Sequence, residues 1–358
     1  MMEWNKQEIS KLTECVNDKM LHLTNHSLHE TCPIGIIDFD LWEWPQGVGL
    51  YGMYKYYSVS GNPQYLEEIK EWYRNRIAAG LPERNVNTTA PMLTLLFLAE
   101  ETDNKEWLAL CRDWAEWVIH DMPRTMEGGL QHIVTGNENR QQLWDDTLFM
   151  TVLFLAKAGK VFRNETYSQE AAYQFLIHAK YLTDVRSGLW FHGWSFERKD
   201  HFADALWARG NCWITAGIPE YLEIASPSPE VRRFLIEILK AQVSALVKLQ
   251  AADGLWHTLL DDAGSYEEAS ASAGFACGML HAIRIGILGR EFLPSACKAV
   301  DAVIRCIDPD GTVTKVSYGT GMGSTLQDYR DIPLCPMAYG QSLTVMMLTE
   351  VSLSEIHH

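Results

Sequence analysis

The sequence of 358 residues predicts an all-α protein built as an (α/α)6 toroid, a closed double ring of six inner and six outer helices. Apolar residues recur at spacings of three and four over long stretches, which is typical of amphipathic helices, and strand-like alternation is nearly missing. Two kinds of helix alternate along the chain. The pattern repeats with a period of roughly 60 residues, and such a period is the sequence sign of a repeat architecture.

The first kind of helix carries charge on one face and apolar residues on the other, as in PQYLEEIKEWYRNRI. This pattern is typical of a helix that lies between solvent and core. We therefore expect outer helices at residues 3–22, 63–77, 105–119, 165–182, 229–249 and 293–307.

The second kind of helix is small and apolar on all sides, as in TTAPMLTLLFLAEET, which indicates burial on every face. Inner helices are expected at residues 47–61, 88–102, 146–160, 209–223, 270–286 and 339–353. No linker rich in Pro, Gly or Ser interrupts the alternation. We therefore expect one domain over residues 1–358.

Three connectors share a glycine turn followed by Leu and then His: EGGLQH (127–132), SGLWFH (187–192) and DGLWH (253–257). Equivalent turns of a ring lie on the same rim, and loops on a rigid scaffold commonly carry function. His132 and His192 are therefore candidates for the site. The alternative is that each merely anchors its loop or packs in the core.

The starts of four inner helices share an aromatic residue followed two positions later by a polar one: Gln46, Asp146, Arg209 or Gln341. Adjacent residues of a helix point about 100° apart, so the two acids of QLWDDTLFM cannot both face the ring centre. The shared register favours Asp146 as the inward acid. Asp145 is then expected to cap the helix.

Arg209 stands in the same register as Asp146. A lone buried arginine most often pairs with an acid on a neighbouring helix, but on an inner wall it could hold a substrate carboxylate with two hydrogen bonds. Trp194, Trp207 and Trp213 are singly typical of a core. Together they favour at least one surface on which a sugar ring stacks.

The composition excludes several classes of function. Subtracting 46 acidic from 30 basic residues gives −16, which disfavours nucleic acid and anionic membranes as partners. The eight cysteines are scattered, so we expect reduced thiols. No apolar run approaches ~18 residues, and we expect a cytoplasmic protein. We expect it to be a monomer or a homodimer. No spacing resembles a zinc site and no nucleotide motif occurs, so neither metal nor cofactor is expected.

The segments QLWDDTLFMTVLFLAKAG, GLWFHGW and LWARGNCWITAGIPEYLE together resemble the unsaturated rhamnogalacturonyl hydrolases of glycoside hydrolase family 105, relatives of the family 88 unsaturated glucuronyl hydrolases. NVNTTAPM and IPLCPMAYGQSL extend the resemblance over most of the chain. It implies that Asp146 is the catalytic acid. One departure stands out, because Asn87 occupies a position where such enzymes often carry a second Asp.

The resemblance also implies a reaction. Asp146 would protonate C4 of a 4,5-unsaturated uronate, and water would add at C5 to give a hemiketal that opens and releases the next sugar. The substrate class that the resemblance implies is unsaturated galacturonyl-rhamnose from pectin rhamnogalacturonan. Arg209, or a protonated His132 or His192, would hold the uronate carboxylate.

The remaining binding roles follow from the same resemblance. Trp44, Trp207 and Trp213 would offer stacking surface, Trp194 would line the substrate site, Met150 would form its floor and Asn87 would hydrogen-bond. Two rival readings stay open: a sugar epimerase or isomerase that uses His132, His192 and His257, and a non-catalytic oligosaccharide-binding toroid.

Overall fold

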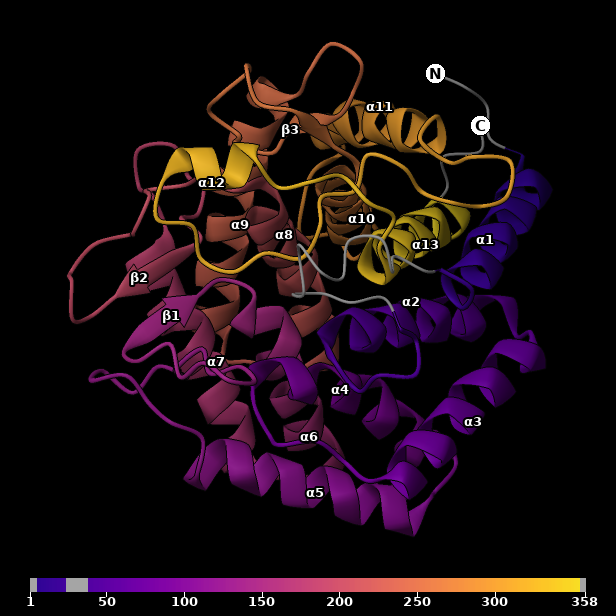
Figure 1. Ribbon diagram of the computed structural model, residues 1–358, viewed down its shortest axis with the longest axis vertical. Helices are drawn as coiled ribbons and strands as arrows, with labels where there is room; N and C mark the ends of the chain where they lie inside the picture. The colour runs from indigo at the N-terminus through magenta and orange to yellow at the C-terminus, as the bar shows by residue number, and fades with distance from the viewer. Residues whose placement is uncertain (1–4, 24–37, 355–358) are drawn as a thin grey trace.

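The computed structural model describes residues 5–23 and 38–354, and within them the chain forms a closed double ring of helices (Figure 1). Each inner helix packs against the next, and the last packs against the first. The predicted (α/α)6 toroid is thus confirmed. The inner helices are α2 (Trp44–Ser60), α4 (Val86–Glu101), α6 (Leu153–Phe162), α8 (Ala208–Ile224), α10 (Ala269–Arg284) and α13 (Ala338–Leu353).

The outer helices run around the periphery of the ring, with α5 along the lower edge of Figure 1 and α11 near its top. Most of them begin at an Asn or Ser whose side chain accepts a hydrogen bond from the first turn, the usual N-cap. They are α1 (Lys6–Met20), α3 (Pro63–Ala79), α5 (Lys105–His120), α7 (Glu165–Leu182), α9 (Pro229–Leu249) and α11 (Leu293–Ile304).

Several short elements lie on the rim of the ring where the inner helices begin. Two antiparallel pairs of strands lie there, and the sequence pattern missed them because strands of two or three residues show no alternation. The pairs are β1 (Gln142–Trp144) with β2 (Gly193–Ser195) and β3 (Trp256–His257) with β4 (Glu267–Glu268). The other short elements are the π-helical turn η2 (Leu148–Val152), the 3-10 turn η3 (Arg290–Phe292) and α12 (Leu326–Arg330).

Inner helices approach one another closely at glycines. A Cβ on Gly47 of α2 would lie 2.6 Å from the backbone nitrogen of Pro91 in α4, and one on Gly278 of α10 would lie 2.2 Å from the carbonyl oxygen of Thr215 in α8. Larger residues at these positions would push the helices apart. The small residues of the inner helices therefore set the diameter of the ring.

The repeated connectors take the turn conformation that their glycines indicated. Gly188 and Gly254 have φ of +83° and +106°, in the left-handed region that L side chains rarely adopt. Similar isolated bridges close the first two turns, between Arg124 and Leu130 and between Thr183 and Trp190. The three connectors are thus equivalent in the backbone although their histidines point to different surroundings.

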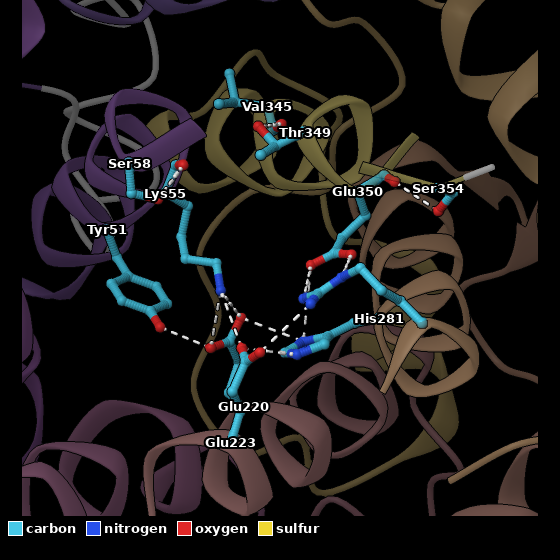
Figure 2. A network of polar contacts seen from close by, with 11 residues as sticks. Tyr51, Lys55, Ser58, Glu220, Glu223, His281, Val345, Thr349, Glu350 and Ser354 are labelled. Carbon is cyan, nitrogen blue, oxygen red and sulfur yellow. Dashed lines mark hydrogen bonds and ion pairs between the residues drawn. The ribbon is translucent and has the colours of Figure 1, made fainter. Parts of the chain in front are cut away.

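A network of charged side chains fills the ring at the end opposite the short strands (Figure 2). Glu220 of α8 lies at its centre, 2% exposed, with Lys55 Nζ 2.9 Å from its Oε1 and the Tyr51 hydroxyl donating to its Oε2 over 2.7 Å. His281 Nε2 lies 3.0 Å from Glu223 Oε2. Four inner helices contribute to this network near their C-terminal ends, so it ties their ends together.

The network is balanced in charge. Arg284 donates two hydrogen bonds to the buried carboxylate of Glu350, over 2.7 and 2.9 Å. The pKa of His281 is raised to about 9, against its burial, by Glu220, Glu223 and Glu350. The pKa of Glu223 is lowered to about 2, mainly by its hydrogen bond with His281. Three cations therefore face three carboxylates near neutral pH.

Donor atoms of Glu220, Glu223 and His281 lie within 4.8 Å of one another, close enough to suggest a metal site. The ammonium group of Lys55 lies 2.9 Å from Glu220 and 3.8 Å from Glu223. A cation is therefore already provided by the chain, and a divalent ion would have to displace it. Among the described helices, none is both long and apolar enough to cross a bilayer.

Replacing Lys55 by Met should lower the free energy of unfolding by about 3–5 kcal/mol, because it leaves the buried carboxylate of Glu220 without its main counter-charge. Lys180→Met is the matched control. Its pair with Glu127 is 58% and 41% exposed, so the loss should stay below about 1 kcal/mol. Urea titrations of both variants measure the difference, and equal losses would contradict a stabilising role for the network.

Candidate active site

A cavity of about 410 Å³ opens where the inner helices begin. Seven of the residues expected at the site line it, and they come from the first turns or the preceding loops of several inner helices: Trp44, Asn87, His132, Asp146, Trp207, Arg209 and Trp213. His192, Trp194 and Met150 do not line it. The ring thus brings together residues more than 160 positions apart in the sequence.

Asp146 lies two residues after the end of β1 and two residues before the π-helical turn η2. Its carbonyl oxygen accepts hydrogen bonds from the backbone N–H groups of Phe149 and Met150, over 3.0 and 2.9 Å. Helices that begin in an ordinary α turn place their first side chain differently, and π turns recur at functional sites. The side chain of Asp146 is 20% exposed, and its Oδ1 is buried 3.3 Å from Nδ1 of His132. The other oxygen is left on the cavity side.

The carboxyl group of Asp146 is poised for proton transfer. Burial raises its pKa to about 7, although the nearby guanidinium of Arg209 and backbone N–H groups act in the opposite direction. Burial disfavours the charged form because the cavity wall solvates it poorly. Asp146 is therefore about half protonated at neutral pH, the condition that general acid catalysis favours.

Asp145 does not cap a helix, contrary to our expectation. It is fully buried, both carboxylate oxygens lack a hydrogen bond of normal geometry, and a Cβ on Gly210 of α8 would lie 2.2 Å from Oδ2. Burial, together with the charge of Asp146, raises the pKa of Asp145 well above its usual value. Asp145 is thus a packing residue between β1 and α8, in surroundings that favour its protonated form.

His132 is held between Asp146 and a tryptophan. Its ring stacks on Trp144 with centroids 4.1 Å apart and planes at 9°, and its Nδ1 lies 2.8 Å from the hydroxyl of Thr147. Burial lowers the pKa of His132 well below its usual value, with His192 adding to the shift. The neutral His132 therefore packs against the carboxyl group of Asp146 without a hydrogen bond to it.

His192 lies behind the cavity wall. Its Nδ1 is 2.7 Å from the hydroxyl of Tyr329, and its ring packs on Trp207 at 4.4 Å. Burial and the charge of Arg209 lower the pKa of His192 to about 3. Neither His132 nor His192 is therefore protonated near neutral pH, so the expected imidazolium that would hold a uronate is not supplied by either ring.

Aromatic rings form much of the wall. Trp44 stacks on Tyr339 of α13 with centroids 4.6 Å apart and meets Trp213 edge to face at 6.3 Å. The guanidinium carbon of Arg209 lies over the ring of Trp207, 4.4 Å from its centroid. Flat apolar faces of this kind suit the apolar face of a sugar ring.

Arg209 is 1% exposed and is committed to the backbone of a neighbouring loop. Its two terminal nitrogens donate to the carbonyl oxygens of Ser317 and Tyr318, over 2.7 and 2.9 Å, and also to the hydroxyl of Ser317. The expected two-bond clamp on a substrate carboxylate is therefore taken up by the protein. Arg209 instead fixes the loop that brings Thr320 and Gly321 to the cavity, and contributes its charge there.

The shared helix register predicted the inward direction only in part. Gln46 donates to the carbonyl oxygen of Asp38, and Gln341 donates to those of Val16 and Gly311. Neither glutamine lines the cavity. Residues at equivalent helix positions leave the helix axis in the same direction. The longer side chains of the two glutamines nevertheless bond to connecting segments of the chain.

Met150 and Trp194 also lie away from the cavity. Met150 is 2% exposed within the apolar core around η2. Trp194 pairs with Leu143 across the two-stranded sheet and stacks on Tyr181 of α7, 5.4 Å between centroids. Both side chains therefore pack in the protein around the site rather than on its surface.

Several lining residues escaped the sequence reading, above all Glu43. It precedes α2, its Oε2 accepts a hydrogen bond from the backbone N–H of Trp44 over 3.1 Å, and the side chain of Asn87 hydrogen-bonds to it. A single glutamate before Trp-Pro carries no recognisable motif. The other lining residues that were missed are Leu41, Pro45, Val134, Thr135, Asn137, Asn139, Thr320 and Gly321.

Comparison with known proteins agrees with this geometry. The sequence model of Glycosyl Hydrolase Family 88 matches residues 13–354. Unsaturated rhamnogalacturonyl hydrolase YesR from Bacillus subtilis is 33% identical over 313 residues, which cover 87% of this chain and 89% of that protein. The crystal structure of a possible GH105 member from Salmonella enterica superposes with a TM-score of 0.95 at 45% identity, over 98% and 95% of the two chains. A possible GH105 member from Klebsiella pneumoniae gives 0.94 at 44% identity, over 99% and 95%.

Replacing Arg209 by Leu should release the loop over residues 317–323. Hydrogen bonds to a charged group contribute about 1.5–3 kcal/mol each, so amide exchange in this loop should speed up by about tenfold or more. Hydrogen exchange followed by mass spectrometry measures it. Arg330→Leu, which removes a half-exposed pair with Asp262, is the control and should leave residues 317–323 protected. Unchanged protection in Arg209→Leu would contradict the anchoring role.

Proposed function

The chain belongs to Glycosyl Hydrolase Family 88 and is a glycoside hydrolase, and we propose that it releases a terminal 4,5-unsaturated uronate from short oligosaccharides. The preferred substrate in this proposal is unsaturated galacturonyl-rhamnose, the disaccharide unit of cleaved rhamnogalacturonan. The similarity to YesR over nearly the whole of both chains supports this choice.

The observation that carries the proposal is the carboxyl group of Asp146, which lies on the cavity wall with a pKa near 7. Asp146 lines a cavity that also contains tryptophans, and its Oδ1 lies 3.3 Å from Nδ1 of His132. Hydrolysis of an ordinary glycosidic bond uses two carboxyl groups that flank that bond. Hydration of an enol ether starts instead from one proton donor beside the double bond, which Asp146 can be.

In the proposed reaction Asp146 donates its proton to C4 of the unsaturated uronate. Positive charge develops at C5 and on the ring oxygen, and water adds at C5. The resulting hemiketal opens by cleavage of the bond between C5 and the ring oxygen. C1 then loses the neighbouring sugar, so the glycosidic bond breaks without a covalent enzyme intermediate.

The anionic sugar is attracted by Arg209, the one cation among the described residues that line the cavity. Its hydrogen bonds go to carbonyl and hydroxyl oxygens rather than to a carboxylate, so its positive charge is not neutralised by a bonded acid. A buried charge without a bonded counter-charge favours an anion nearby. The uronate would supply that anion.

Asp146→Asn should reduce kcat by about 10²–10⁴-fold, the usual contribution of a general acid, while Asp145→Asn should stay within about threefold of the native enzyme. The second variant is a matched control because Asp145 is fully buried and does not line the cavity. The assay follows the loss of enol-ether ultraviolet absorbance on a panel of lyase-generated unsaturated disaccharides. Equal damage from both substitutions would exclude Asp146 as the particular donor, and absence of turnover on every disaccharide would overturn the function.

The pH dependence should show the acid directly. A proton donor works only while protonated, so kcat/KM should fall tenfold per pH unit above about pH 7, the pKa of Asp146 in the free enzyme. Stopped assays from pH 4 to 9 give the profile, and Asp145→Asn should keep its alkaline limb. A flat profile up to pH 9 would contradict Asp146 as the donor.

A further inference from the structure

The cavity holds a second carboxylate that the proposed reaction has not yet used. Glu43 lines the same cavity as Asp146 and stands at the N-cap of α2. It is fixed from both sides along the chain, because the indole of Trp42 donates to the carbonyl oxygen of Thr88 over 2.8 Å and Trp44 stacks on Tyr339. Its side chain is therefore held at the cavity by neighbours that are themselves anchored.

Asn87 connects Glu43 to the side of the cavity that contains Asp146. Its amide hydrogen-bonds to the carboxylate of Glu43, and it lies in the first turn of α4, which packs against both α2 and η2. The preceding residue, Val86, donates its backbone N–H to the carbonyl oxygen of Ile133 over 3.1 Å. Ile133 adjoins His132, the partner of Asp146. A continuous run of contacts thus leads from Glu43 through Asn87 to His132 and Asp146.

We propose, on the basis of the proposed function, that Glu43 is the second carboxylate of the reaction and accepts the proton of the water that adds to C5. Asn87 holds the Glu43 carboxylate toward the cavity in this role. An acid that donates a proton to C4 and a base that removes one from water are both needed in one addition. The cavity offers a carboxyl group for each.

The step balances in atoms and charge. The C4=C5 electron pair takes the proton of Asp146 to form a C4–H bond, and a lone pair of water forms the new C5–O bond. One O–H bond of that water breaks and its proton passes to Glu43. Asp146 then holds one proton fewer and Glu43 one more, and exchange with solvent restores both.

The surroundings of the two carboxylates separate their roles. Burial raises the pKa of Glu43 above its usual value, while the hydrogen bonds from the Trp44 backbone and from Asn87 oppose the shift by stabilising the charged form. Asp146 has no such amide donor from a side chain, and its pKa is about 7. The other titratable or charged groups that line the cavity are His132, which is neutral, and Arg209. Two carboxyl groups in different surroundings commonly divide acid and base work.

Glu43→Gln tests the proposal with little risk to the fold, because the amide oxygen of Gln can still accept from the backbone of Trp44. We expect kcat to fall by about 10²-fold or more while KM changes less than about threefold. Glu43→Asp, which keeps a carboxylate, should recover at least about tenfold of that loss. The control is Asp40→Asn, in the same segment and 76% exposed, which should match the native enzyme.

The pH profile of the variants decides between a base and a mere binding group. The native kcat/KM should fall on the acid side as Glu43 becomes protonated, and Glu43→Gln should lose this acid limb while keeping the fall above about pH 7. A kcat of Glu43→Gln within threefold of native, a persistent acid limb, or a rise in KM alone would overturn the proposal. If the native enzyme and Asp40→Asn turn over no unsaturated disaccharide, the proposed function itself has failed.

Discussion

Closure of the ring between α13 and α2 is the constraint on which the cavity depends. Ser342 donates a hydrogen bond to the carbonyl oxygen of Val48, over 2.5 Å, and the absence of a side chain on Gly52 lets the two helices approach. This contact brings Tyr339, near the end of the chain, face to face with Trp44. Asp146 lies just before the third inner helix, and the loop that Arg209 anchors lies after the fifth. An open ring would place these groups on separate surfaces.

The sequence predicted the helices well because both helix types are defined locally, by the period of their apolar residues. It also predicted seven of the residues that line the cavity, since equivalent positions in a ring repeat face the same rim. It failed where a side chain reaches beyond its own repeat. The bonds of Arg209 to Ser317 and Tyr318 span more than 100 residues and end on carbonyl oxygens, which every residue carries. No sequence pattern could have distinguished those acceptors.

The same limit explains the two acids. Asp145 was expected to cap a helix, as acids at a helix start commonly do. Its carboxyl group instead packs against Gly210 on another helix, where a side chain would leave it no room. Glu43 offered no pattern to the sequence, and its position became visible only through Asn87 and the cavity it lines. The amide at position 87, which looked like a missing carboxylate, lies beside a carboxylate from the neighbouring helix.

The inner helices begin at the cavity end of the ring, and the C-terminal parts of four of them meet at the network of Lys55, Glu220, His281 and Glu350 (Figures 1 and 2). The aligned peptide dipoles therefore present their positive ends to the cavity and their negative ends to a region that contains three cations. This parallel arrangement gives a protein of net charge −16 one local region that attracts anions. The direction of the chain in the ring, as much as any single arginine, thus favours an acidic sugar at the end where the helices begin.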